Sequence, residues 1–281
     1  MTRVVVYGNC QGGPIGRLLE RACPDFEVVR APPVHTIPAD GPEVEALEAL
    51  MRGADIVLSQ PVDAAWGRRG SAHLRQVYAR SEWIEFPSIY FGGVFPYLQY
   101  LRIGGGKSLQ GPLGDYHDQR IVSAWEAGLS EADAVARLAA ADVEYCRERF
   151  HAALAESRRR EQGLPIQVMD HVERHVAGAR TFHTFNHPTN AVMWEVVMQF
   201  LRLVSARMQV PGPPQNQYLD HVSAAVPAEL AEAAGVAATD PRYCLARREI
   251  APAELVREFY RAYAATPDFA AIVAANRLAG R

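Results

Sequence analysis

The sequence predicts an α/β fold in which an open, mainly parallel sheet is flanked by helices. Short strands that are apolar at consecutive positions alternate with amphipathic helices in the N-terminal part of the chain. Strands of this kind are typical of parallel sheets that are covered on both faces. Helix patterns dominate the rest. We therefore expect one α/β domain over residues 1–281, with a sheet-rich part (1–125) and a helix-rich part (126–281) that carries the His183–His187 segment.

The elements of the sheet-rich part follow from these patterns. Strands are expected at 4–7, 26–29 and 55–59, and helices at 15–23 and 43–51. Residues 84–114 are rich in aromatic residues, glycine and proline, which predicts a loop region instead of regular structure. Long loops of this kind often bind ligands.

The elements of the helix-rich part begin with a capping-box-like start at Ser130. It predicts one long helix that runs to near Glu161. Further helices are expected around 169–177, 190–204, 254–264 and 269–275. A helix is also expected to begin near Gln119, with Asp115 or Asp118 as its N-cap.

Composition excludes several classes of function. The net charge is −3 and charged residues make up 22% of the chain, so we expect no nucleic-acid partner. No apolar run is long enough for a membrane span or a signal sequence. The four cysteines lack zinc or C-x-x-C spacing, which indicates a reduced, cytoplasmic protein.

The candidate nucleophile is Cys10, within the motif Gly8–Gly12 that joins the first strand to the first helix. Ligands collect at the carboxyl ends of parallel strands, and a helix N-terminus stabilises a thiolate. The alternative is a buried structural cysteine. A dinucleotide- or phosphate-binding turn is disfavoured, because the glycine spacing does not match and no Walker lysine is present.

Oxyanion donors are expected on the same turn. The backbone N–H groups of Gln11, Gly12 and Gly13 can hold a developing negative charge, and the side chains of Asn9 and Gln11 can add donors. Gln60 ends the third strand and is therefore expected at the same edge of the sheet. The alternative for Gln60 is an ordinary exit from strand to loop.

Histidines supply the candidate bases. His183 and His187 lie with Asn186 on a turn before an apolar helix, a combination that suits a general base and an orienting amide. His117 lies between Asp115 and Asp118, whose carboxylates are expected to favour its charged form and a contact with substrate.

His171 and His175 have a zinc-compatible spacing on a predicted helix. No third ligand is evident, so we interpret them as part of a solvated face and expect no metal.

Several of these motifs together resemble the WcbI-type family of polysaccharide biosynthesis proteins, acetyltransferases of bacterial capsule assembly. The matching segments span much of the chain: Tyr7–Gly12, Ser59–Pro61, Gly114–His117 and Asn186–Pro188. The resemblance implies an SGNH-hydrolase-like sheet with Cys10 in place of the serine. It also implies coenzyme A binding and acyl transfer to a sugar hydroxyl.

The expected function is therefore transfer of an acetyl group from acetyl-coenzyme A to a hydroxyl of a sugar or polysaccharide precursor. Cys10 would accept the group, with His187 as the base because Pro188 holds it in an extended turn. Coenzyme A is expected to bind the 90–114 segment, through Tyr90 stacking on adenine and through Arg102 and Lys107 meeting phosphates.

Two other functions remain open at this point. A thioesterase or sugar esterase would use the same Cys10 and histidine with water as the acceptor. A non-catalytic nucleotide- or sugar-binding protein would keep Cys10 as a structural residue.

Overall fold

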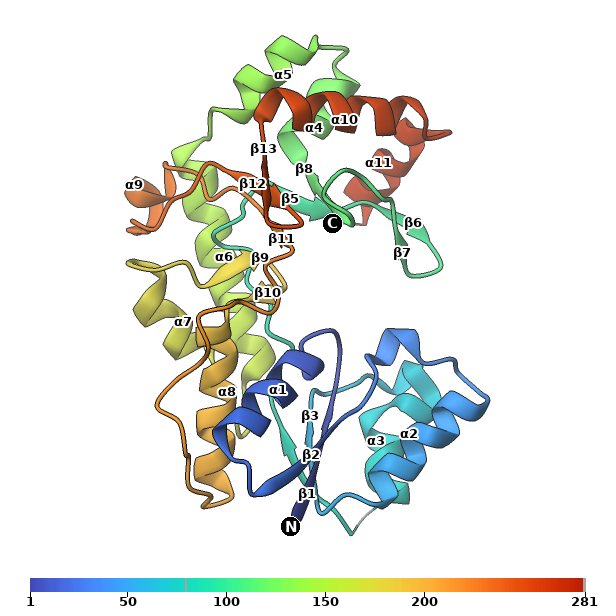
Figure 1. Ribbon diagram of the computed structural model, residues 1–281. Helices are drawn as coiled ribbons and strands as arrows, with labels where there is room; N and C mark the ends of the chain where they lie inside the picture. The colour runs from blue at the N-terminus through green and yellow to red at the C-terminus, as the bar shows by residue number, and fades with distance from the viewer. Residues whose placement is uncertain (79, 280–281) are drawn as a thin grey trace. The chain divides into compact units, whose positions relative to one another are not determined.

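A four-stranded, all-parallel sheet is formed by the N-terminal part of the chain in the computed structural model, which describes residues 1–78 and 80–279 (Figure 1). Its order is β2-β1-β3-β4, with bounds β1 (Thr2–Tyr7), β2 (Phe26–Arg30), β3 (Ile56–Ser59) and β4 (Glu82–Glu85). The three expected strands are confirmed. The fourth was not expected; it pairs in parallel with β3 from Glu82 to Glu85 and ends inside the 84–114 segment that we expected to be a loop.

Helices cover both faces of this sheet. Alternate side chains of β1 point to opposite faces, and Val5 and Tyr7 share a core with α2 (Pro42–Arg52) and α3 (Ser71–Val77). On the other side lie α1 (Gly12–Ala22) and α8 (Asn190–Leu203), which pack against each other (Figure 1). The open parallel sheet with flanking helices is therefore confirmed.

The chain divides into two compact units, each built from three separate segments. The first unit, which holds the parallel sheet, comprises Met1–Tyr90, Ala155–His175 and His187–Leu219. The second comprises Phe91–Leu154, Val176–Asn186 and Asp220–Arg281.

The second unit contains short antiparallel strands. They form the pair β5 (Leu98–Tyr100) and β8 (Tyr116–Asp118), the hairpin β6 (Arg102–Gly104) and β7 (Lys107–Ser108), and a sheet of β11 (Val222–Ser223), β12 (Tyr243–Leu245) and β13 (Arg248–Ile250). The expectation that 84–114 lacks regular structure is thus wrong. Strands of two or three residues are too short to show a period-two pattern in the sequence.

One long helix was expected from Ser130 to near Glu161, and this expectation is wrong. The side chain of Ser130 does cap α5 (Glu131–Leu138), accepting from the backbone N–H of Asp133 at 3.2 Å. However, α5 ends there because Arg120 donates to the backbone C=O of Leu138 at 2.9 Å, which satisfies a carbonyl at the helix end. Asp142 then caps the start of α6 (Val143–Glu161) by accepting from Tyr145 N at 2.7 Å.

The remaining elements agree with the expected positions or are short. The helices are α4 (Gln119–Glu126), α7 (Met169–Val176), α9 (Leu230–Ala234), α10 (Pro252–Ala264) and α11 (Phe269–Leu278), and the short segments are η1 (Val34–Thr36), η2 (Ala64–Arg69), β9 (Phe182–Thr184) and β10 (His187–Pro188). Within the described residues, no helix has the length and apolar character that crossing a membrane requires.

Candidate functional site

Cys10 lies on the turn between β1, which ends at Tyr7, and α1, which begins at Gly12. Its side chain is half-buried and is not part of a disulfide. The thiol is therefore at the carboxyl end of a central strand of the parallel sheet, in the position that the sequence predicted.

Two buried glutamine amides hold this turn. Gln60, 3% exposed, accepts from Asn9 N at 2.8 Å and donates to Gln11 Oε1, also at 2.8 Å. The Gln11 amide in turn bonds both backbone groups of Ile89, donating to its C=O at 2.7 Å and accepting from its N–H at 3.0 Å. The ends of β1 and β3 and the loop after β4 are thereby tied together at one edge of the sheet.

The same contact explains a glycine of the motif. A Cβ at Gly8 would lie 2.5 Å from Oε1 of Gln60, and Gly8 has φ of +159°. Any other residue at position 8 would push the Gln60 amide away from Asn9. The contact between Gly8 and Gln60 therefore helps to shape the Cys10 turn.

Most of the expected oxyanion donors already have acceptors within the protein. Asn9 Nδ2 donates to Ser88 Oγ at 3.1 Å, and Gln11 N donates to Asn9 Oδ1 at 2.9 Å. Gly12 N donates to the C=O of Asn9 at 3.1 Å, and the Gln11 amide is occupied as described above. The side chains of Asn9 and Gln11 and the first two N–H groups therefore position the turn.

Gly13 differs from these donors. In residues 1–78 and 80–279, its N–H has no hydrogen-bond acceptor, and a Cβ built on it would meet no atom within 4 Å. This N–H is therefore a donor of the turn that remains available to a developing negative charge. Ser88 and Ile89 belong to the same site, and sequence reasoning missed them because nothing but their place after a strand marked them.

Burial raises the pKa of the Cys10 thiol above its ordinary value, and backbone hydrogen bonding offsets only part of this effect. The expectation of a thiolate stabilised by the helix is therefore wrong for this structure. Cys10 precedes the first helical residue by two positions, and loss of solvation is the largest cause of the raised pKa. A nucleophilic role for Cys10 then requires a base.

The histidine segment is divided between the two units. His187, in β10, belongs with Cys10 to the first unit and is 7% exposed. His183 lies in β9 of the second unit, where Nδ1 is 3.3 Å from Ser223 Oγ. Asn186, also in the second unit, accepts at Oδ1 from Tyr116 OH at 2.6 Å and from Thr184 Oγ1 at 3.1 Å, which fixes the direction of its amide.

His117 is fully buried in the second unit. Its ring nitrogens lie 3.1 Å from Tyr263 OH and 3.0 Å from the C=O of Leu109. Burial lowers the pKa of His117 and outweighs the opposite effect of Asp115, so the expectation that the charged form of His117 is favoured is wrong. A substrate contact at His117 was expected, but its ring has no exposed surface here.

The two carboxylates beside His117 have other roles. Asp118 is the N-cap of α4, accepting from Arg120 N at 2.9 Å, and it pairs with the guanidinium of Arg120 at 2.8 Å. Asp115 is exposed and accepts from Gln110 Nε2. The cap role that the sequence offered for Asp118 is confirmed.

The residues expected to bind coenzyme A are placed as follows. Arg102 and Lys107 lie on the β6–β7 hairpin of the second unit. The Arg102 guanidinium is 4.2 Å from the centre of the Tyr100 ring and donates to Ser108 Oγ at 2.8 Å, while Lys107 is exposed. Tyr90 belongs to the first unit, where its C=O accepts from Ser157 Oγ at 2.7 Å.

No metal centre is evident in the described part of the chain, which lacks any group of three or more His, Cys, Asp or Glu residues that could hold an ion. The rings of His171 and His175 stack with centroids 4.2 Å apart, and His175 Nδ1 lies 2.7 Å from the C=O of His171.

Comparison with known proteins shows which family the chain belongs to. A family model described as the polysaccharide biosynthesis enzyme WcbI matches residues 3–209, which is well over half of the chain. The chain belongs to the WcbI family. The matched region includes the Cys10 turn, Gln60, the Tyr116–Asp118 strand and the His183–His187 segment.

A solved structure of WcbI, described as a novel polysaccharide biosynthesis enzyme, has the same fold. It aligns with a TM-score of 0.81 and 19% identity over 97% of this chain and 92% of that one. That structure is described as the native protein without a disulfide bond between coenzyme A and one of its cysteines. No curated protein matches the chain.

Proposed function

We propose that this WcbI-family protein transfers an acyl group, acetyl in the first instance, from a coenzyme A thioester to a hydroxyl of a sugar or polysaccharide precursor. The observation that carries the proposal is the half-buried Cys10 thiol, on a turn that the Gln11 and Gln60 amides hold and that also carries the Gly13 N–H. A nucleophile next to an oxyanion donor is the core of an acyl-transfer site.

The first half of the proposed reaction loads Cys10. His187 accepts the thiol proton, and Cys10 Sγ attacks the thioester carbonyl. The Gly13 N–H donates to the oxygen that gains negative charge. When the carbon–sulfur bond to coenzyme A breaks, the proton on His187 passes to the departing sulfur.

The second half transfers the acyl group. His187 removes the proton from the acceptor hydroxyl, whose oxygen attacks the carbonyl carbon on Cys10, and the Cys10 sulfur leaves with the proton held by His187. The product is a sugar ester, and the thiol is regenerated. Asn186, whose Oδ1 is held by Tyr116 and Thr184, is proposed to orient the base or a substrate carbonyl.

The reported coenzyme A of the WcbI structure supports the choice of donor. The half-buried thiol of Cys10 suits the sulfur end of such a donor. In direct transfer, without a covalent intermediate, only the base and the oxyanion donor would be needed. A thioesterase or sugar esterase would use water in place of the sugar hydroxyl.

The test measures release of coenzyme A from acetyl-coenzyme A, with and without a panel of free and nucleotide sugars. We expect Cys10→Ser and Cys10→Ala to keep the fold and lose turnover by about 100-fold or more, as removal of a nucleophile does. Cys244→Ser is the matched control, because Cys244 is also a half-buried free thiol.

Three outcomes separate the candidate functions. Wild-type turnover that depends on sugar supports the transferase, and equal turnover without sugar supports the hydrolase. A near-wild-type rate in Cys10→Ala would contradict the covalent route.

A further inference from the structure

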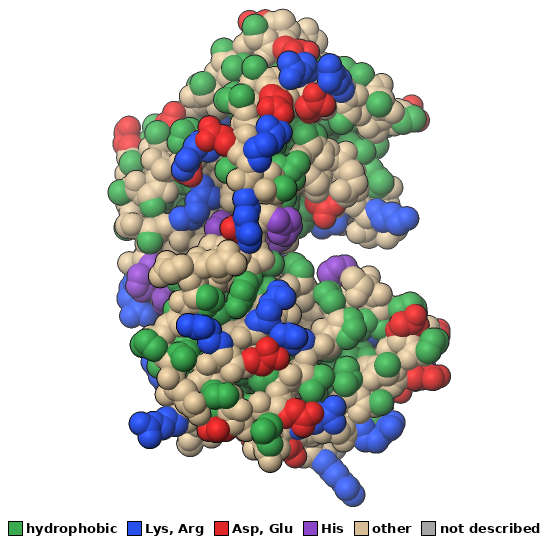
Figure 2. All heavy atoms as spheres, viewed as in Figure 1, with side chains coloured by type: hydrophobic (Ala, Val, Ile, Leu, Met, Phe, Trp, Pro, Cys, Tyr) green, Lys and Arg blue, Asp and Glu red, His purple; other side chains and the backbone are tan. Residues whose placement is uncertain are grey.

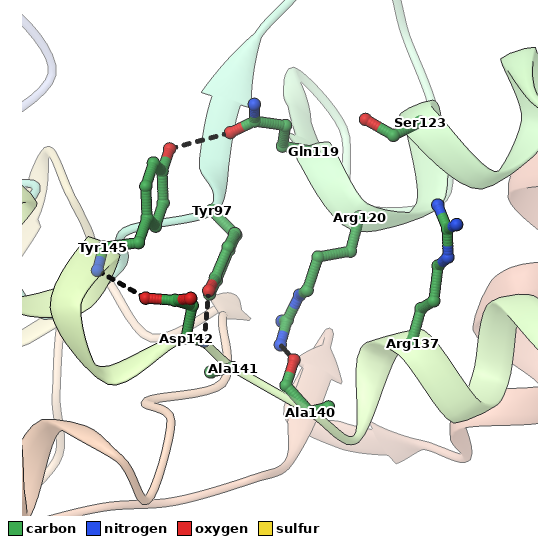
Figure 3. A pocket seen from close by; sticks show the side chains of 9 residues that line it. All are labelled: Tyr97, Gln119, Arg120, Ser123, Arg137, Ala140, Ala141, Asp142 and Tyr145. Carbon is green, nitrogen blue, oxygen red and sulfur yellow. Dashed lines mark hydrogen bonds between the residues drawn. The ribbon is translucent and has the colours of Figure 1, made fainter.

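A pocket of about 500 Å³ lies in the second unit, and none of the residues proposed for acyl transfer lines it (Figure 3). It is formed by the start of α4, the end of α5, the loop between α5 and α6, and the first turn of α6. Its lining residues are Tyr97, Gln119, Arg120, Ser123, Arg137, Ala140, Ala141, Asp142 and Tyr145. The volume is within the range of about 300–1,000 Å³ that is usual for small-molecule sites.

An aromatic wall occupies one side of this pocket. The rings of Tyr97 and Tyr145 stack with centroids 5.0 Å apart and an interplanar angle of 24°. Hydrogen bonds hold both, since Tyr97 OH accepts from Asp142 N at 2.8 Å and Tyr145 OH donates to Gln119 Oε1 at 3.0 Å. A rigid tyrosine surface of this kind packs well against the C–H face of a pyranose ring, which is apolar and slightly positive.

The two arginines of the pocket differ in what they can bind. The charge of Arg120 is compensated by Asp118 at 2.8 Å, and its other donors reach the C=O of Leu138 at 2.9 Å and Tyr243 OH at 3.1 Å. Arg137 is exposed, and among the described residues its guanidinium has no ion-pair or hydrogen-bond partner. Its planar guanidinium is suited to a carboxylate.

The two ends of the pocket also differ in charge. Figure 3 shows Arg137 and Ser123 at one end, and Tyr145 and Asp142 at the other. Asp142 carries the carboxylate of the site, and it is used as the N-cap of α6. An anionic group is therefore repelled from the tyrosine end and attracted to the Arg137 end, with the Ser123 hydroxyl close by.

We infer that this pocket binds an anionic sugar residue. The pyranose ring lies against the Tyr145 side of the stacked pair, since the Arg120 guanidinium already lies over the Tyr97 ring at 4.4 Å, and its carboxylate meets Arg137. Gln119 Nε2 and Ser123 Oγ, which have no partners within residues 1–78 and 80–279, are placed to bond ring hydroxyls. No step at Cys10 enters this inference, so it goes beyond acyl transfer and does not depend on it.

The test is a titration of the full-length protein followed by saturation-transfer NMR. The probes are methyl β-D-glucuronide, the neutral methyl β-D-glucoside, and inorganic phosphate. We expect the glucuronide to bind more tightly than the glucoside by at least fivefold, and phosphate to compete weakly. If phosphate bound more tightly than either sugar, the pocket would be a simple anion site and the inference would be overturned.

Four variants locate the binding. Arg137→Ala should weaken the glucuronide by at least fivefold and leave the glucoside nearly unchanged. Arg207→Ala, which removes an equally exposed arginine of the first unit, should change neither. Tyr145→Leu should weaken both sugars, whereas Tyr145→Phe, which keeps the ring, should retain most of the binding.

Two results would place the sugar elsewhere. One is glucuronide binding that survives both Arg137→Ala and Tyr145→Leu. The other is its loss in Cys10→Ala, which leaves this pocket intact and should bind like the wild type. Thermal unfolding of each variant confirms that the pocket still folds.

Discussion

At the residue scale, the surroundings of Cys10 determine how its thiol reacts. Burial removes water that would solvate a thiolate, and the nearest helix residue is two positions away. Most donors of the turn form hydrogen bonds within the protein that fix its shape, whereas the Gly13 N–H has no acceptor among the described residues. The residue is therefore placed for attack on a carbonyl and depends on a base to become reactive.

Alkylation measures this directly. Because burial raises the pKa of Cys10, the fraction of thiolate at pH 7 is smaller than in an ordinary cysteine of pKa about 8.5. Labelling by iodoacetamide should be slow at pH 7 and should still be rising with pH above 9. Peptide mass spectrometry follows Cys10 and uses Cys244, whose pKa burial also raises, as an internal reference. A rate for Cys10 that has already reached its plateau at pH 7 would show a thiolate and contradict this account.

The base is tested by comparing His→Gln at three positions. His187→Gln should lower the acyl-transfer rate by about 100-fold or more and remove the lower limb of its pH profile. His183→Gln should have a smaller effect on the rate. His117→Gln should mainly lower the melting temperature, because the ring bonds Tyr263 and Leu109 inside the core. Equal small losses in rate, or the largest loss at His117, would overturn the assignment to His187.

At the element scale, the β6–β7 hairpin is the segment proposed to meet coenzyme A. Gly104, Gly105 and Gly106 form its tip with φ of 93°, 58° and 76°, a conformation that side chains disfavour. The adjacent Lys107 is the only lysine in the sequence. The hairpin thus carries the exposed Lys107 ammonium as well as the Arg102 guanidinium.

A single lysine allows a clean measurement. We expect coenzyme A to protect Lys107 from an amine-directed reagent, with the N-terminal amine as the internal control. In calorimetry, Arg102→Glu and Lys107→Glu should each weaken coenzyme A binding several-fold, because the phosphates lose a cation. Unprotected Lys107 together with an unchanged dissociation constant would move the phosphate site to another element.

At the scale of the whole molecule, the two units are interleaved along the chain. The first unit needs residues 187–219 as well as the N-terminal segment, because α8 packs on α1 and the Phe26 and Phe200 rings lie 6.2 Å apart. Gln209 N also donates to the C=O of Ala22 at 2.8 Å. Neither unit is encoded by one continuous stretch of sequence. On the face that Figure 2 shows, acidic and basic side chains are interspersed.

This interleaving predicts the behaviour of fragments. A chain of residues 1–125 contains the parallel sheet but lacks α8, so the side of α1 that packs on α8 would be exposed to water. We expect this fragment to show no cooperative thermal transition and to bind a hydrophobic dye, while the full chain unfolds cooperatively. A fragment that melts cooperatively with native near-UV circular dichroism would show that the sheet-rich part folds alone.

Local patterns allowed much of this to be predicted from sequence. The order β1, Cys10 turn, α1 was predictable, because each part has a local signal in the sequence. The strand is a run of consecutive apolar residues, the turn contains glycines, and the helix has an apolar period of about 3.6 residues. The cap of α4 by Asp118 and the start of α5 at Ser130 are local for the same reason. The break at the end of α5 was not predictable, since it depends on Arg120, a residue 18 positions away from Leu138.

The sequence by itself determined the class of sheet, the place of Cys10 at its edge and the family, because these follow from contiguous motifs. Only the tertiary structure decided what the polar groups of the site do. Gln60 reaches Asn9 across 51 residues, and Gln11 reaches Ile89 across 78. Those contacts occupy hydrogen-bond donors that the sequence suggested for catalysis. Burial raises the pKa of Cys10 and lowers that of His117, and the neighbouring residues in the sequence predicted the reverse for both. The physical reason is that solvation and hydrogen-bond satisfaction depend on every atom packed around a group, including those far away along the chain.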